Sequence, residues 1–179
     1  MATEIERKFL VRETAFLDGR KGERIVQGYV AKESGAMSTR VRIRGERAYL
    51  TLKGPREGIS RDEFEYAIPV ADARQLLEQY CGNRIIQKTR YVVDFAAQAF
   101  EVDVFEGRHA GLVIAEIELQ SEHTPIVLPH WIGDEVTHDR RYGNYILAQF
   151  EGPPRPPEAS WFASPPSVHA MSAALGVTH

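Results

Sequence analysis

The chain has 179 residues, of which 43% are hydrophobic and 26% are charged, and its formal net charge is −3. This composition is typical of one soluble globular domain, and it gives no overall attraction to nucleic acid or to an anionic membrane. Any anion site must therefore be a local cluster of lysine and arginine. Cys81 is the single cysteine, which excludes an internal disulfide and a thiolate metal cluster.

The cell compartment expected from the sequence is the cytoplasm. A lone cysteine fits a reducing environment. No apolar run approaches the ~20 residues that are needed to cross a bilayer. The first residues also lack the basic and apolar regions of a secretion signal.

The first predicted element is a strand over residues 4–10. Because successive side chains of a strand point to opposite faces, Glu4, Glu6 and Lys8 share one face. A solvent-exposed face would explain one such strand on its own. The same alternation recurs along the chain, so the charged faces need a common explanation.

The rest of the chain predicts further strands, two helices and a tail. The additional strands are expected over residues 24–31, 39–44, 48–53, 60–68, 85–94, 99–105 and 112–119. Asp72 is the expected N-cap of a helix that ends at Tyr80, and a second helix is expected over residues 138–149. The proline-rich residues 151–179 have little periodicity, so we predict a flexible extension after a domain over residues 1–150.

The charged faces of these strands can be arranged in two ways. In the first arrangement they point outward from a meander with a charged exterior. In the second they line the interior of a closed or nearly closed antiparallel barrel. The grouping of charges favours the interior. Arg40, Arg42 and Arg44 stand together, which suits a polyanion because guanidinium groups bind phosphate oxygens in pairs.

Acidic residues on the same faces are grouped as well. Glu4 stands with Glu6, and Glu116 stands with Glu118. Paired carboxylates suit hard divalent cations such as Mg²⁺ or Mn²⁺. The two kinds of group together predict a site for phosphate and metal, whereas a purely structural domain would leave both unexplained.

These groups follow one another in an order that resembles a known family. An ExExK motif, Glu4-Ile5-Glu6-Arg7-Lys8, is followed by Arg40-Val41-Arg42, Leu52-Lys53, Glu63-Phe64-Glu65, Lys88-Thr89-Arg90, Glu101-Val102-Asp103 and Glu116-Ile117-Glu118. From Met1 to about Phe150 the chain closely resembles the CYTH family, the triphosphate tunnel metalloenzymes, and within it the small bacterial inorganic triphosphatases. The resemblance implies a mainly β (α+β) fold, an eight-stranded antiparallel β-barrel tunnel with a charged lumen and a few flanking helices.

The resemblance also implies roles for individual residues. The implied substrate-binding residues are Lys8, Arg40, Arg42, Lys53, Lys88 and Arg90. The implied metal ligands are Glu4, Glu6, Glu63, Glu101, Asp103, Glu116 and Glu118. The expected catalytic residues are Lys88, which would orient a water molecule, and Glu4 and Glu118, with Mg²⁺ or Mn²⁺ as the cofactor.

The activity that the resemblance implies is metal-dependent hydrolysis of inorganic triphosphate to diphosphate and phosphate. Family members also include class IV adenylate cyclases and thiamine or nucleoside triphosphatases, and a non-catalytic polyphosphate or nucleotide sensor is an alternative of another class. Short connections and no evident base-binding aromatic cluster favour triphosphate over nucleotide. The expected partner is a small-molecule triphosphate, without nucleic acid or membrane, and the chain is expected to be a monomer or a homodimer.

Overall fold

The structure is a computed structural model that describes residues 2–30, 37–55 and 57–155. Most of the predicted flexible extension, residues 156–179, lies outside the described residues. Within the described part, one sheet has the strand order β5-β4-β3-β2-β6-β7-β8-β1-β9. The strands are β1 (Ala2–Val11), β2 (Glu23–Tyr29), β3 (Ser38–Arg44), β4 (Arg47–Lys53), β5 (Ser60–Ile68), β6 (Ile85–Phe95), β7 (Gln98–Phe105), β8 (Val113–Glu118) and β9 (Ile132–Glu135).

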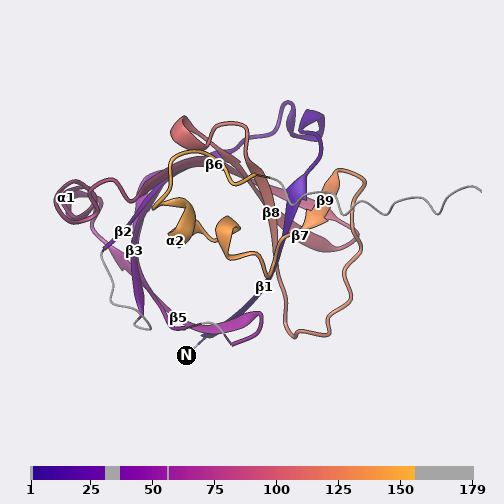
Figure 1. The fold of residues 1–179 in the computed structure, drawn as a ribbon, viewed down its shortest axis with the longest axis horizontal. Coiled ribbons are helices and arrows are strands. Elements are labelled where there is room, and N and C mark those ends of the chain that lie inside the picture. Colours follow the sequence, from indigo (N-terminus) through magenta and orange to yellow (C-terminus); the bar gives the residue numbers. More distant parts are fainter. Residues whose placement is uncertain (1, 31–36, 56, 156–179) are drawn as a thin grey trace, which may run out of the picture.

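Strand β1 closes this sheet into a barrel because its two ends pair with different strands. Its first residues pair with β5, from Ala2 opposite Glu63 to Ile5 opposite Ser60. Residues 6–10 pair with β8, and all of these pairings are antiparallel. Strands β1 to β8 therefore form a closed ring (Figure 1), which confirms the predicted eight-stranded antiparallel barrel.

The short strand β9 was not predicted. It pairs with the far end of β1, where Phe9 lies opposite Glu135. Phe9 also pairs with Ala115 of β8, so β8 and β9 lie on the two sides of β1 at this point. Phe9 and Trp131, next to β9, belong to an apolar cluster on the outer face of β1, β6, β7 and β8. The four-residue β9 thus covers part of the barrel's exterior.

Helix α1 (Val70–Tyr80) covers another part of the exterior. Leu77 and Cys81 pack with Val41 of β3 in a second apolar cluster, and α1 lies outside the ring of strands (Figure 1). The predicted N-cap Asp72 is wrong: the helix begins at Val70 with Pro69 at the N-cap, and Asp72 lies in the first turn. The Pro69 carbonyl accepts a hydrogen bond from Ala73 N, which starts the helical ladder earlier than Asp72 would.

The predicted helix over residues 138–149 is also wrong, because the chain forms two short helices there. The 3₁₀ helix η3 (Arg140–Tyr142) is followed by one turn of α-helix, α2 (Asn144–Leu147). Gly143 between them has extended backbone angles, φ −72° and ψ 130°, which interrupt the helical pattern. The helix α2 projects over the interior of the ring (Figure 1).

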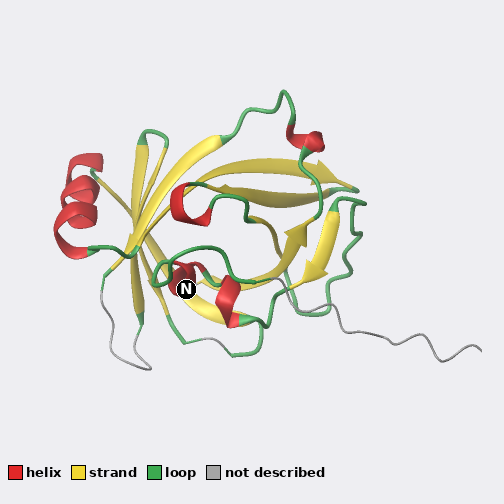
Figure 2. Ribbon diagram, turned by 45° about the horizontal axis from the view of Figure 1, so that its top comes forward, coloured by secondary structure: helices red, strands yellow, loops and turns green. Residues whose placement is uncertain are grey.

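Helix α2 closes one end of the barrel interior with an apolar cluster. Leu147 and Ala148 pack there with Tyr29, Ile86 and Phe105, all of which are almost completely buried. Figure 2 shows α2 and the short 3₁₀ helices, which include η1 (Ala15–Leu17) and η2 (Gly107–His109), set among and around the strands. In the described residues, no helix is long and apolar enough to cross a membrane.

Candidate active site

The barrel encloses a cavity of about 1490 Å³ whose walls carry the charged faces of the strands. Most of the predicted site residues line it: Glu4, Glu6, Lys8, Arg40, Arg42, Lys53, Glu63, Arg90, Glu101, Glu116 and Glu118. Lys88 and Asp103 are not among the residues that line it, and both are buried, with exposed fractions of 1% and 0%. The cavity therefore unites residues from sequence segments more than a hundred positions apart.

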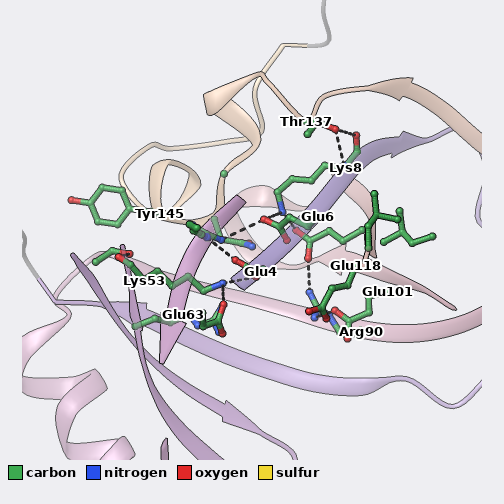
Figure 3. A pocket seen from close by; sticks show the side chains of 18 of the residues that line it. Glu4, Glu6, Lys8, Lys53, Glu63, Arg90, Glu101, Glu118, Thr137 and Tyr145 are labelled. Atoms are coloured by element: carbon green, nitrogen blue, oxygen red, sulfur yellow. Dashed lines mark hydrogen bonds and ion pairs between the residues drawn. The ribbon is translucent and has the colours of Figure 1, made fainter. Parts of the chain in front are cut away.

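Four glutamates form an acidic patch on the wall made by β1, β8 and β7. Strand register places Glu6 directly opposite Glu118, and Glu101 directly opposite Glu116. Figure 3 shows the side chains of Glu6, Glu101 and Glu118 directed into the same pocket, together with Glu4. Like charges directly opposite one another destabilise a strand pair, so this wall favours the presence of cations.

Glu118 is the carboxylate of this patch whose negative charge is least compensated by basic side chains. In the described part of the chain, no ion pair to Glu118 is formed. Its pKa is raised, first by burial and then by the negative charges of Glu4, Glu101 and other glutamates around it. The surroundings of Glu118 therefore carry an excess of negative charge.

Two lysine side chains neutralise four other glutamates of the cavity. Lys8 Nζ lies 3.1 Å from Glu6 Oε1 and also forms a hydrogen bond with Glu116. Lys53 Nζ lies 2.7 Å from Glu4 Oε1 and 2.5 Å from Glu63 Oε2. These contacts place each lysine between two carboxylates from different strands.

The pKa of Glu4 illustrates how strong this compensation is. Burial alone would raise the pKa of Glu4, but the charges of Lys53 and Arg61 lower it to about 2. Arg61 Nε lies 2.6 Å from Glu4 Oε2, and Arg61 Nη2 lies 3.3 Å from Glu6 Oε1. Glu4 is therefore a carboxylate that stays ionised.

A basic patch lies on the wall made by β3. Arg40 and Arg42 share one carboxylate, with Nη2 atoms 3.3 Å and 2.9 Å from Glu65 Oε2. The Nε atoms of both arginines are buried and have no hydrogen-bond partner among the described residues. The pKa of Arg42 is lowered by burial and by the positive charge of Arg40, so the patch carries an excess of positive charge.

Asp103, which is fully buried, joins two basic side chains of β6. Lys88 Nζ lies 2.5 Å from Asp103 Oδ2, and Arg90 binds both oxygens of Asp103 at 2.6 Å. Arg90 also reaches the cavity, where its Nη2 lies 3.0 Å from Glu116 Oε2. Burial lowers the pKa of Lys88 to about 8, although Asp103 opposes this shift.

The site predicted from the sequence left out several side chains that line the cavity, among them Asn144, Tyr29 and Tyr145. Asn144 of α2 accepts a hydrogen bond from Lys88 Nζ at 3.5 Å. Tyr29 and Tyr145 form an edge-to-face pair with ring centroids 5.4 Å apart. Tyr29 lies on the face of β2 that points into the barrel, and the alternation of side chains along the strand could have indicated this. The position of α2 over the barrel leaves no periodic signal in the sequence.

The fold and the site define a class: an antiparallel barrel whose interior holds opposed acidic and basic patches. The CYTH domain profile matches residues 2–145, and the chain belongs to the CYTH domain family. It is 46% identical over 149 residues to an inorganic triphosphatase of Acetivibrio thermocellus, covering 83% of this chain and 95% of that protein. It is 39% identical over 150 residues to an inorganic triphosphatase of Nitrosomonas europaea, covering 82% and 97%.

A solved structure agrees with this family membership. The crystal structure of an inorganic triphosphatase matches with a TM-score of 0.64 and 35% sequence identity, over 85% of this chain and 98% of that chain.

The CYTH family implies a divalent metal, and the donor set of the cavity fits one. The acidic patch offers only carboxylate oxygens, which are the ligands of hard divalent cations. Glu6 and Glu118 face each other in register, so a cation there would relieve their repulsion. In the described residues, no three acidic, histidine or cysteine side chains already form a compact metal-binding group.

Proposed function

We propose that this protein hydrolyses inorganic triphosphate to diphosphate and phosphate inside the barrel. The observation that carries the proposal is the pair of buried Nε atoms of Arg40 and Arg42, which lie at the cavity and have no hydrogen-bond partner in the described part of the chain. A buried donor without a partner is costly, and a phosphate oxygen is the acceptor that best suits guanidinium groups. The names of the two relatives support the same substrate.

The basic residues would hold the phosphate chain. Lys8, Arg40, Arg42, Lys53 and Arg90 all line the cavity and come from four strands, β1, β3, β4 and β6. They surround an anion from several sides, which fixes its orientation as well as its position. In the transition state their charges would stabilise the negative charge that develops on the transferred phosphoryl group.

The acidic residues would hold the metal. We propose Mg²⁺ or Mn²⁺, bound by ligands from the set Glu4, Glu6, Glu63, Glu101, Asp103, Glu116 and Glu118. When bound, such an ion would neutralise phosphate charge and lower the pKa of a water molecule. Glu4 and Glu118 are the proposed catalytic carboxylates, because Glu4 stays ionised and Glu118 has no ion-pair partner among the described residues.

In the reaction, the oxygen of water forms a bond to a terminal phosphorus while the phosphoanhydride bond to that phosphorus breaks. The leaving diphosphate takes the electron pair of the broken bond, and the proton of the water passes to solvent or to a phosphate oxygen. Lys88 remains the proposed residue for orienting the water. Its amine is buried but contacts Asn144, which lines the cavity, so Lys88 would act at the edge of the site.

The assay for this proposal compares possible substrates. Phosphate release is measured from inorganic triphosphate, ATP and thiamine triphosphate, with Mg²⁺, with Mn²⁺ and with a chelator, and cyclic AMP is measured in the ATP samples. Rapid metal-dependent release from inorganic triphosphate supports the proposal. Cyclic AMP as the main product would contradict it, and so would tight triphosphate binding without any product.

We also propose that the protein works in the cytoplasm, as a monomer or a homodimer, on a small-molecule triphosphate rather than on nucleic acid or a membrane. Cys81 is the single cysteine and is buried, and a chain without a cysteine pair suits a reducing compartment. Size-exclusion chromatography with light scattering checks the oligomeric state.

A further inference from the structure

Arg108 connects two segments that are distant in the sequence. It lies in η2 and does not line the cavity. Its Nη2 donates hydrogen bonds to the carbonyl oxygens of Asn83 at 2.8 Å, Ile85 at 3.0 Å and Ala148 at 2.7 Å. Its Nη1 lies 3.3 Å from Glu151 Oε1. One guanidinium group thus joins the start of β6 to the end of α2.

The two joined segments carry the two members of a contact at the cavity. Strand β6 carries Lys88, three residues beyond Ile85. Helix α2 begins at Asn144, and Ala148 N donates to the Asn144 carbonyl at 3.0 Å, which links the two ends of the helical turn. Lys88 Nζ and Asn144 Oδ1 then meet at 3.5 Å.

We propose that Arg108 is a positioning residue for the reaction, which sets Asn144 beside Lys88 by joining the end of α2 to the start of β6. The inference rests on the proposed function. The planar guanidinium group matters here, because it presents several donors in a fixed geometry that an ammonium group does not reproduce. Leu147 and Ala148 are each 1% exposed, so apolar packing keeps α2 in the barrel when Arg108 is lost.

The first test compares Arg108→Gln with Glu151→Gln. Glu151 is the matched control because it contacts the same guanidinium group from an exposed position, with a side chain that is 84% exposed. Arg108→Gln is expected to lower kcat about tenfold or more with little change in KM for triphosphate, since small misplacement near a reaction is costly and the β3 arginines are untouched. Glu151→Gln is expected to change neither. An unchanged kcat in Arg108→Gln would overturn the proposal.

A double-mutant cycle on kcat shows whether Arg108 acts through Asn144. If it does, Arg108→Gln combined with Asn144→Ala is no slower than Asn144→Ala alone, because the position that Arg108 sets no longer matters. If the double variant instead lowers kcat by the product of the two single effects, Arg108 does not act through Asn144 and the proposal is overturned.

Hydrogen exchange tests the link without any turnover. The amides of Leu147 and Ala148 bond to the carbonyls of Gly143 and Asn144, and Arg108→Gln is expected to speed their exchange while the amides of β3 keep their rates. Unchanged exchange at these two amides would overturn the positioning role. If the wild type does not hydrolyse triphosphate, the proposed function fails while the exchange result still decides the role of Arg108. If Arg108→Gln does not fold, Arg108→Lys is used instead. Faster exchange is expected at the same two amides, and unchanged exchange would again contradict the positioning role.

Discussion

Glu6 on β1 and Glu118 on β8 are direct cross-strand partners, so two carboxylates face each other inside the barrel. Glu6 is compensated by Lys8 at 3.1 Å and by Arg61 at 3.3 Å. Glu118 forms no ion pair with any described residue, and the glutamates around it raise its pKa after burial. Bases therefore compensate the charge of Glu6, and a divalent ion would compensate that of Glu118.

Replacing Glu118 should separate metal binding from stability. Glu118→Gln is expected to raise the metal concentration for half-maximal activity about tenfold or more, because a carboxylate ligand is lost. It should leave the free energy of unfolding of the metal-free protein unchanged or higher by up to about 1 kcal/mol, because it removes like-charge repulsion. Metal titrations of activity and urea unfolding in chelator measure the two effects. A variant with wild-type metal dependence would refute the assignment.

Asp103 should be important for stability because it neutralises two buried cations. Asp103→Asn leaves Lys88 and Arg90 without their shared carboxylate, and we expect a loss of about 3–5 kcal/mol in the free energy of unfolding. Glu101→Gln is the control, since Glu101 contacts the same Arg90 but its side chain is 39% exposed, and a loss of about 1 kcal/mol or less is expected. Equal losses in urea unfolding would show that burial of Asp103 does not matter.

The basic patch should bind triphosphate without metal. Replacing Arg40 and Arg42 together by glutamine removes two charged donors, each of which contributes about 1.5–3 kcal/mol to a hydrogen bond with a charged partner. The dissociation constant for triphosphate in chelator is therefore expected to rise at least about a hundredfold in calorimetric titrations. Arg47→Gln is the control, because Arg47 is on the neighbouring β4 but is exposed and does not line the cavity. An unchanged constant for the double variant would rule out this phosphate site.

The contact between Arg7 and Glu135 should make the docking of β9 depend on pH. Arg7 Nε and Nη2 lie 2.8 Å and 2.5 Å from the two oxygens of Glu135, and these hydrogen bonds lower the pKa of Glu135. A lowered carboxylate pKa contributes stability that is present above the ordinary value and is lost as pH falls through the lowered value.

Both side chains are about one-third exposed, so the coupling is expected to be only about 0.2–1 kcal/mol at pH 7. A double-mutant cycle with Arg7→Gln and Glu135→Gln, followed by urea unfolding at pH 7 and at a pH below the pKa of Glu135, measures it. Coupling of the same size at both pH values would contradict this account.

The strands could be predicted from the sequence because a period of two residues survives in each of them, whereas the closed eight-stranded barrel was implied by the family resemblance. Glu4, Glu6 and Lys8 keep this period within one strand, and the barrel then determines which way they face. Helix boundaries were less predictable. Gly143 adopts extended angles inside an otherwise helical pattern, and this depends on packing of α2 into the barrel, which local sequence does not report.

The pairing of charges in the site could not be predicted from any single strand. The sequence groups Lys88 with Arg90, but only the fold shows that Lys88 is buried against Asp103 while Arg90 also reaches the cavity. Asn144 and Arg108 were equally hidden, since their partners lie 56 and 40 residues away, at Lys88 and Ala148. Such contacts arise from tertiary structure and have no periodic signature.

The most direct test of the proposed function is the stoichiometry of products from inorganic triphosphate. The purified protein is incubated with triphosphate and either Mg²⁺ or excess chelator, and phosphate and diphosphate are quantified together. We predict one phosphate and one diphosphate for each triphosphate consumed with metal, and no consumption with chelator. Intact triphosphate in the presence of Mg²⁺ and of Mn²⁺, or equal consumption in chelator, would contradict metal-dependent hydrolysis in this barrel.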